Sequence, residues 1–167
     1  MITKTALKIA VPFPRVESFE SYLFIGPHPD DIEIGAGATA AKLVSMGKKV
    51  TFLICTDGRY GTDNISGIGP DELAEKRKQE SILSAKTLGV SNVRFLELSD
   101  GGFYDLWELE EGIAKTVAEV KPDMVFAPDP DVTSECHKDH LNTGNCAKII
   151  CQFSGNPGIM EKYGAEA

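Results

Sequence analysis

The sequence predicts a single α/β domain built on a mostly parallel, Rossmann-like sheet with helices on both faces. Short apolar segments of strand character alternate along the chain with longer segments whose apolar residues recur at helical spacing. Glycine or proline marks most of the junctions between them. The length of 167 residues suits one domain with its own core.

The first half of the chain contains two strand–helix units. Residues 22–26 are apolar and predict a strand, and residues 36–47 predict a helix that ends at its last glycine. Residues 49–55 are largely β-branched and apolar, which is typical of a strand covered on both faces. The loop at 56–70 is rich in Gly, Asp and Asn, and we expect it to shape specificity because long loops after strands are usually functional.

The second half continues the same alternation. Residues 70–88 predict a helix with a proline in its first turn, and residues 93–98 predict the next strand. Residues 106–120 carry an apolar helical stripe, and residues 124–127 form a short strand after a helix-breaking proline. A polar loop then leads into a last helix at about 137–152.

The two ends of the chain look different from the middle. Residues 1–21 predict an N-terminal arm, in which 5–12 form an extended segment or an edge strand. We expect one domain over 1–167 and a truncated C-terminus, at which the chain stops at Ala167.

Composition argues against some classes of binding partner and indicates the cellular compartment. Seventeen basic and twenty-five acidic residues give a net charge of −8, and no basic stripe is present, which argues against nucleic acid as a partner. No apolar run is long enough to span a bilayer and no secretory leader pattern is visible, so we expect a cytoplasmic protein without a membrane partner. The four cysteines form no CxxC pair, and we expect even Cys136, beside a histidine, to be non-catalytic.

All three histidines of the chain fall into two short clusters, and each cluster directly follows a predicted strand. The clusters are His28-x-Asp30-Asp31 and His137-x-Asp139-His140. Because the carboxyl ends of parallel strands meet at one edge of a sheet, the clusters should converge there. Two histidines and one aspartate are a ligand set of catalytic zinc, and the remaining carboxylate and His–Asp pair suit a general base and an oxyanion donor. The inventory predicts metal-assisted hydrolysis of an acyl bond.

Other interpretations of these clusters remain open. Aspartates and histidines at these points can simply cap helices, although capping does not explain why all three histidines lie there. Gly35-Ala36-Gly37 suggests a nucleotide-binding turn, but the preceding carboxylates would repel phosphate. Two histidines and one aspartate also describe the facial triad of iron oxygenases, so another divalent ion stays an alternative to Zn2+.

The chain resembles the LmbE-like (PIG-L) zinc-dependent N-deacetylases, which remove an N-acetyl group from amino sugars. Within that family it is most similar to the diacetylchitobiose deacetylases. The resemblance rests on PHPDDIEIGAGAT (27–39), TDGRYGT (56–62), RKQES (77–81), LGV (88–90) and FAPDP with HKDH (126–140). It covers nearly the whole chain from Tyr22 onward.

The resemblance implies a role for each motif residue. It implies three zinc ligands, namely His28, Asp31 and His140. It implies Asp30 as the general base, and His137 as the group that stabilises the oxyanion or protonates the leaving amine, with Asp139 orienting it. Arg77 and Asp100 match sugar contacts, although an ion pair of Arg77 with Glu75 or Glu80 is an equal alternative.

The same resemblance implies an N-acetylated sugar substrate of the N-acetylglucosamine or chitobiose type and a homo-oligomer, a trimer or hexamer. Three departures from the family pattern are Ile32, Glu135 and Lys138, and none removes a predicted ligand. Relatives continue beyond the equivalent of Ala167 with strands that wall the substrate pocket. A truncated, non-catalytic zinc-binding relative is therefore the alternative function.

Overall fold

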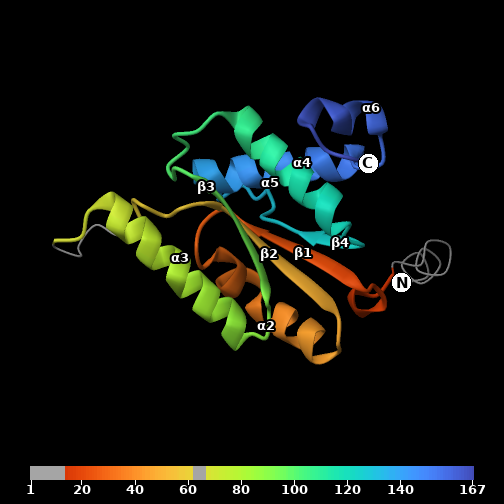
Figure 1. Ribbon diagram of the computed structural model, residues 1–167, viewed down its shortest axis with the longest axis horizontal. Helices are drawn as coiled ribbons and strands as arrows, with labels where there is room; N and C mark the ends of the chain where they lie inside the picture. Colours follow the sequence, from red (N-terminus) through yellow and green to blue (C-terminus); the bar gives the residue numbers. More distant parts are fainter. Residues whose placement is uncertain (1–13, 62–66) are drawn as a thin grey trace.

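A four-stranded parallel sheet runs through the middle of the computed structural model, which describes residues 14–61 and 67–167. The strand order is β3-β2-β1-β4 (Figure 1). The strands are β1 (Ser21–Gly26), β2 (Lys49–Thr56), β3 (Asn92–Leu98) and β4 (Met124–Phe126). All the pairings are parallel, so the sheet is more regular than the mostly parallel sheet that the sequence predicts.

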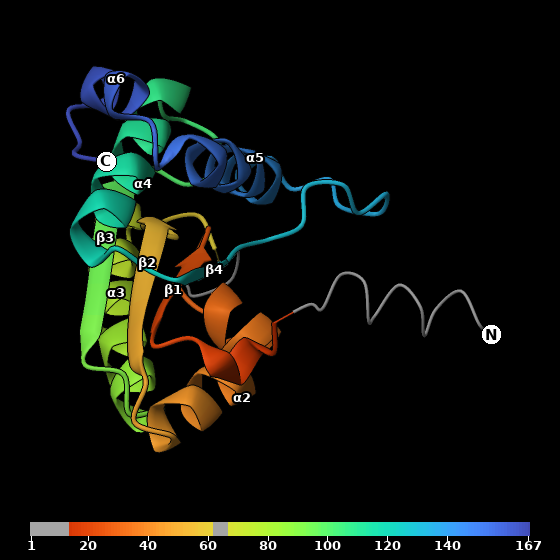
Figure 2. The same ribbon diagram turned by 90° about the vertical axis from the view of Figure 1, so that its right-hand side faces the viewer.

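Helices lie between these strands and after the last of them, and they cover both faces of the sheet. They are α2 (Asp31–Ser45), α3 (Pro70–Thr87), α4 (Leu106–Val120), α5 (Lys138–Phe153) and α6 (Pro157–Met160), with the short 3-10 turns η1 (Val16–Ser18) and η2 (Glu161–Tyr163). Figure 2 shows α4 and α5 on one side of the sheet and α2 on the other. Among the described residues, no helix combines the length and the apolar character that a membrane span requires.

Alternate residues of β1 supply the two halves of the core. Leu23 and Ile25 pack with buried residues of α4 and α5, whereas Tyr22 and Phe24 pack with buried residues of α2. The period of two follows from strand geometry, and burial on both faces explains why the strand is continuously apolar. The predicted α/β class with two covered faces is confirmed.

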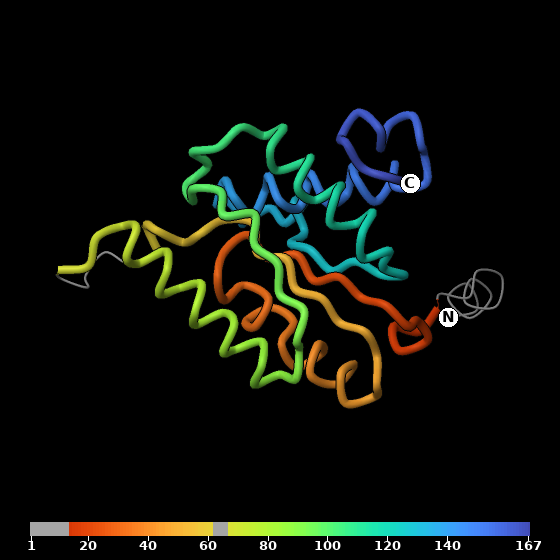
Figure 3. The backbone as a smooth tube through the Cα atoms, viewed as in Figure 1, coloured from red at the N-terminus to blue at the C-terminus, as the bar shows by residue number. Residues whose placement is uncertain are grey.

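The order of the strands fixes the place of the site. From β1 the chain moves outward through β2 to β3, and then α4 carries it across the sheet so that β4 lies on the other side of β1 (Figure 3). The direction of winding therefore reverses between β1 and β4. In open parallel sheets, ligands bind beyond the carboxyl ends of the strands at this kind of reversal.

Most predicted boundaries agree with the structure to within two residues, but the first helix does not. It begins at Asp31 rather than at 36, so Gly35 and Gly37 lie inside α2 and form no turn. The turn is made instead by residues 27–30, where Asp30 takes a positive φ of 119° as the residue before the helix. The predicted N-terminal segment 5–12 lies outside the described residues.

Candidate active site

The loop after β1 presents the first cluster. Gly26 ends the strand so closely against α2 that a Cβ at this position would lie 2.7 Å from Cγ1 of Ile32. The chain can therefore turn at once, and the backbone N–H of His28 donates to Oδ2 of Asp31 at 2.8 Å. Asp30 sits between them in the left-handed region, a strained position for a residue other than glycine.

The loop after β4 presents the second cluster at the start of α5. His137 caps this helix, because its Nδ1 accepts the backbone N–H of Asp139 at 3.3 Å. In a neutral ring this acceptor role leaves the proton on Nε2. His140 lies one turn further on, and Nδ1 of its ring is 2.9 Å from Oε2 of Glu135. His137 thus caps α5 and also belongs to the second cluster.

The two clusters converge as predicted. Ligand atoms of His28, His137 and His140 all lie within 4.8 Å of one another. The ring centroid of His28 is 4.6 Å from that of His137 and 5.3 Å from that of His140. His28 is more than one hundred residues from His137 and His140 in the sequence, yet all three histidines lie together at the strand reversal.

The donor atoms fit a divalent cation. Oδ2 of Asp31 lies 3.0 Å from Nδ1 of His28 and 3.4 Å from Nε2 of His140. Ligands about 2.0–2.1 Å from a tetrahedral zinc are about 3.3–3.4 Å apart, so the second separation matches this value and the first is shorter by about 0.3–0.4 Å. Because the carboxylate lies between two imidazoles, these three side chains can hold a metal ion.

A further carboxylate holds the outer nitrogen of each of these two imidazoles. Nε2 of His28 is 3.0 Å from Oδ2 of Asp139, and Nδ1 of His140 contacts Glu135. Metal-ligating histidines usually donate their second ring N–H to such a group, which fixes the tautomer and the ring orientation. Oδ2 of Asp139 is 3.9 Å from Nδ1 of His137, so its carboxylate lies nearer to His28 than to the histidine that it was expected to orient.

The contacts between His28 and its two carboxylate neighbours shift the pKa values of all three groups. Burial alone would lower the pKa of His28, but hydrogen bonds to Asp139 and Asp31 outweigh it and raise the pKa to about 9. The same contacts hold the pKa values of Asp31 and Asp139 below their ordinary range, against the opposing effect of burial. A cation bound here would displace the shared protons, because metal ligands bind in the deprotonated form.

Asp30 contacts Arg77 of α3 and lines the same cavity as His28 and His140. Nη2 of Arg77 donates to Oδ2 of Asp30 at 2.9 Å and also to the backbone carbonyl of Pro29. The Asp30 side chain is half exposed, so its carboxylate is accessible from the adjoining cavity. Arg77 is therefore paired with Asp30 rather than with Glu75 or Glu80, the partners considered from the sequence.

A cavity of about 390 Å³ contains the remaining predicted residue. Its lining includes all three histidines together with Asp30, Arg77 and Asp100. Asp100 is 5% exposed, and its Oδ2 accepts the backbone N–H of Tyr60 at 3.2 Å. Burial raises the pKa of Asp100 above its ordinary value. The volume lies within the range of about 300–1,000 Å³ that small-molecule sites occupy.

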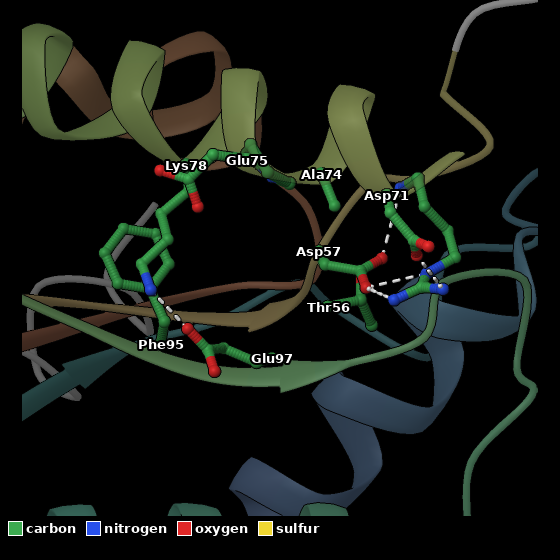
Figure 4. A pocket seen from close by; sticks show the side chains of 10 residues that line it. Thr56, Asp57, Asp71, Ala74, Glu75, Lys78, Phe95 and Glu97 are labelled. Atoms are coloured by element: carbon green, nitrogen blue, oxygen red, sulfur yellow. Dashed lines mark hydrogen bonds and ion pairs between the residues drawn. The ribbon is translucent and has the colours of Figure 1, made fainter. Parts of the chain in front are cut away.

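A second cavity, of about 250 Å³, lies between α3 and the edge of the sheet (Figure 4). Figure 4 shows Lys78 paired with Glu97 beside the ring of Phe95. Arg59, which also lines this cavity, is paired with Asp57 and Asp71. These two cations of the second cavity already have acidic partners, and no histidine lines it. The three histidines and the predicted base, Asp30, line the first cavity instead.

Sequence reasoning identified the cluster but missed two contacts within it. Glu135 stood out only as a departure from the family pattern, and its contact with His140 was not foreseen. The contact between Asp139 and His28 was missed because it joins residues 111 positions apart. The only available signal for Glu135 was an acidic residue in the same loop as the histidines.

Comparison with known proteins gives the family. Residues 23–151 match the family model described as "PIG-L: GlcNAc-PI de-N-acetylase". The chain belongs to the PIG-L family. The match covers both histidine clusters and all four strands from Leu23 onward, so the resemblance inferred from the motifs is confirmed.

Two similar members of the PIG-L family are diacetylchitobiose deacetylases. The enzyme of Thermococcus kodakarensis is 34% identical over 159 residues, which cover 95% of this chain and 58% of the relative. The solved structure of the enzyme from Pyrococcus horikoshii has a TM-score of 0.86 and 34% identity, and the match covers 97% of this chain and 61% of that chain.

A third relative comes from Kineococcus radiotolerans and is described as a 1D-myo-inositol 2-acetamido-2-deoxy-alpha-D-glucopyranoside deacetylase. It is 38% identical over 124 residues, which cover 70% of this chain and 34% of the relative. The chain thus spans about three fifths of the length of the diacetylchitobiose deacetylases it matches and about a third of this relative.

Proposed function

We propose that this PIG-L family chain is a zinc-dependent N-deacetylase that removes the acetyl group from an N-acetylated amino sugar of the N-acetylglucosamine or chitobiose type. The observation that carries the proposal is the convergence of His28, His137 and His140 within 4.8 Å, with a carboxylate between two of them. The relatives support the substrate class, since they are described as deacetylases of N-acetylated amino sugars.

Zinc is the proposed cation, and its ligands are His28, Asp31 and His140. When bound, the ion would lower the pKa of a coordinated water to about 7 and polarise the acyl carbonyl. Nitrogen and carboxylate donors at near-tetrahedral spacing support zinc over calcium or magnesium, which prefer oxygen ligands.

Asp30 is the proposed general base. Its carboxylate is half exposed, lines the cavity and is adjacent in sequence to a ligand, so it can take a proton from water at the reacting carbon. The hydrogen bond from Arg77 fixes one of its oxygens and leaves the other for the proton. A base held in this way contributes about 10²–10⁴ in rate.

His137 is the proposed donor to the substrate. Its Nδ1 accepts the helix-capping hydrogen bond, so the ring offers Nε2–H on its other side. This group can stabilise the developing oxyanion, for which a single donor contributes about 3 kcal/mol, or protonate the leaving amine. Asp139 would then orient His137 through its backbone N–H, while its carboxylate supports His28.

Arg77 and Asp100 are proposed to contact the hydroxyl groups of the sugar, because both line the cavity that contains the histidines. A homo-oligomeric assembly and a cytoplasmic location complete the proposal, the first by family resemblance and the second from sequence composition. The alternative of a truncated, non-catalytic relative is not favoured, since the relatives that match most of this chain are described as deacetylases.

Metal analysis combined with an amine-release assay tests the proposal. The purified chain should contain about one zinc per protomer and release amine from N,N'-diacetylchitobiose or N-acetylglucosamine. A chelator should abolish release, and zinc should restore it. His140→Ala should lose the metal and the activity together. A chain that holds zinc but releases no amine from any N-acetyl sugar would contradict the proposed activity.

A further inference from the structure

Two aromatic side chains line the cavity that contains the histidines and remain largely uncovered. Phe103 is 74% exposed and Tyr60 is 52% exposed. Their ring centroids are 6.1 Å apart and their planes meet at 85°, so the rings form a corner. Both residues lie in the lining of the 390 Å³ cavity together with His28 and His137. We call Tyr60 and Phe103 the aromatic corner.

The turn that carries Phe103 is fixed by the proposed catalytic cluster. Gly101 has a φ of +78°, and a Cβ at this position would lie 3.0 Å from the Phe103 ring. The backbone N–H of Gly101 donates to Oδ2 of Asp139 at 2.7 Å. Nζ of Lys138 donates to the carbonyl of Gly102 at 3.1 Å. The backbone of the turn that carries the ring is therefore held by residues next to the histidines.

Tyr60 is attached to the same turn through Asp100. The buried Asp100 carboxylate accepts the Tyr60 backbone N–H, so one side chain joins the loop after β2 to the loop after β3. The two rings consequently have a defined spacing relative to each other and to the histidines. Neither ring is buried by its neighbours, and the two rings together form an exposed apolar surface at the cavity, a feature that ligand-binding grooves often have.

We infer that the aromatic corner packs against the C–H face of a pyranose ring of the substrate and so determines specificity for sugars over simple acetamides. This inference rests on the proposed function. A pyranose has one face rich in C–H groups and a rim of hydroxyls, and aromatic faces attract C–H groups because their π-systems carry partial negative charge. The cavity offers both features, since Asp100, Arg77 and Asp30 line it beside the rings.

The polar groups also argue against a purely apolar occupant. A lipid chain on the aromatic corner would offer no hydrogen bond to the second oxygens of the Asp30 and Asp100 carboxylates, and covering polar atoms without such bonds is unfavourable. A sugar satisfies the apolar rings and the polar groups together. Small-molecule sites commonly combine aromatic walls with a few placed polar groups in this way.

Sugar binding measured without turnover tests the inference. In the Asp30→Ala background, saturation-transfer NMR should show contacts from the protein to pyranose C–H protons of N,N'-diacetylchitobiose. Adding Phe103→Ala should weaken this binding by about tenfold and reduce the C–H signals, because the ring supplies the contact area. Phe103→Tyr should restore most of the affinity. Leu83→Ala, which removes a 65% exposed apolar side chain from α3, is the matched control and should have no effect.

Kinetics separate this inference from the proposed activity. With Asp30 intact, Phe103→Ala should raise KM for the sugar about tenfold and change kcat little, since the ring does not contact the reacting carbonyl. If the chain binds sugar through the aromatic corner yet hydrolyses nothing, the inference stands and the proposed function fails. Unchanged KM and affinity in Phe103→Ala would overturn the inference. So would a change of oligomeric state without a change in sugar affinity, because the corner would then be a contact between copies.

Discussion

The carboxylate of Glu135 lies 2.9 Å from Nδ1 of His140, so Nε2 of the same ring is left to face Asp31 at 3.4 Å. Asp139 has the same relationship to His28, at 3.0 Å from Nε2. Each predicted histidine ligand is thus oriented by its own acidic residue. The pair Asp139–His28 joins the two strand ends, whereas Glu135–His140 lies within one loop.

Glu135→Gln should weaken zinc binding by about 10–100-fold, because outer partners of metal-bound histidines contribute affinity of this order. Glutamine keeps an acceptor for the backbone N–H groups of Cys136 and His137, so the loop should retain its shape. Competition with a chromogenic chelator measures the affinity.

The matched control for this change is Glu119→Gln. Glu119 pairs with Arg94 at the surface and is not among the residues that line the histidine cavity. Its replacement should leave zinc affinity unchanged. Equal affinities for the wild type and Glu135→Gln would show that Glu135 does not support His140.

The sequence predicted the convergence because strand order decides it. Once β1 and β4 are both parallel strands, His28 and His140 follow carboxyl ends at the same edge. The outer carboxylates could not be predicted in the same way, since their roles depend on side-chain direction. Asp139 was assigned to its sequence neighbour His137, whereas its buried carboxylate contacts His28 in the loop after the neighbouring strand, β1.

The error at the start of α2 has a local cause. Two glycines at 35 and 37 indicated a loop, because glycine is unfavourable inside helices. In the structure Gly37 packs near Leu88, with a Cβ position 3.6 Å from its Cδ1, and tertiary packing outweighs propensity there. The turn into the helix is made before these glycines, where Asp30 takes a left-handed conformation.

Asp30→Ala should reduce amine release by about 10²–10⁴ while the zinc content stays at the wild-type level. The reason is that Asp30 contacts Arg77 and the cavity, whereas the two proposed histidine ligands, His28 and His140, contact Asp31. Metal analysis and initial rates on the same preparation check both parts. Activity retained in Asp30→Ala would remove Asp30 from the role of base.

Asp71→Ala is a suitable comparison for Asp30→Ala. Asp71 is a 93% exposed carboxylate on the first turn of α3, and it also pairs with an arginine, Arg59. Its loss removes a surface ion pair, which contributes at most about 1 kcal/mol to stability. Rates for this variant should match the wild type.

Cys136→Ser should leave both zinc content and amine release unchanged. Cys136 is exposed and contributes only its backbone N–H to the site, through Oε1 of Glu135, and serine preserves that group. Cys55 is buried, and burial raises the pKa of its thiol well above the usual range. Timed alkylation with mass spectrometry should therefore label Cys136 and spare Cys55 in the folded protein. A loss of activity in Cys136→Ser would contradict its non-catalytic assignment.

Gly26→Ala should destabilise the fold by about 1–3 kcal/mol, because overpacked core positions respond on this scale. The new methyl group would lie 2.7 Å from Cγ1 of Ile32, in the first turn of α2, and could be accommodated only if the helix moved. That movement would also separate His28 from Asp31, so zinc affinity should fall with stability. Thermal unfolding with and without zinc measures both effects.

Gly35→Ala, in the same helix, should have the opposite effect. No atom lies within 4 Å of a Cβ at Gly35, and alanine is favoured over glycine in helix interiors by about 0.5–1 kcal/mol. The melting temperature should therefore rise in Gly35→Ala and fall in Gly26→Ala, although both variants add one methyl group to the same region. If both variants lost stability equally, the close contact between Gly26 and Ile32 would not be what positions the first cluster.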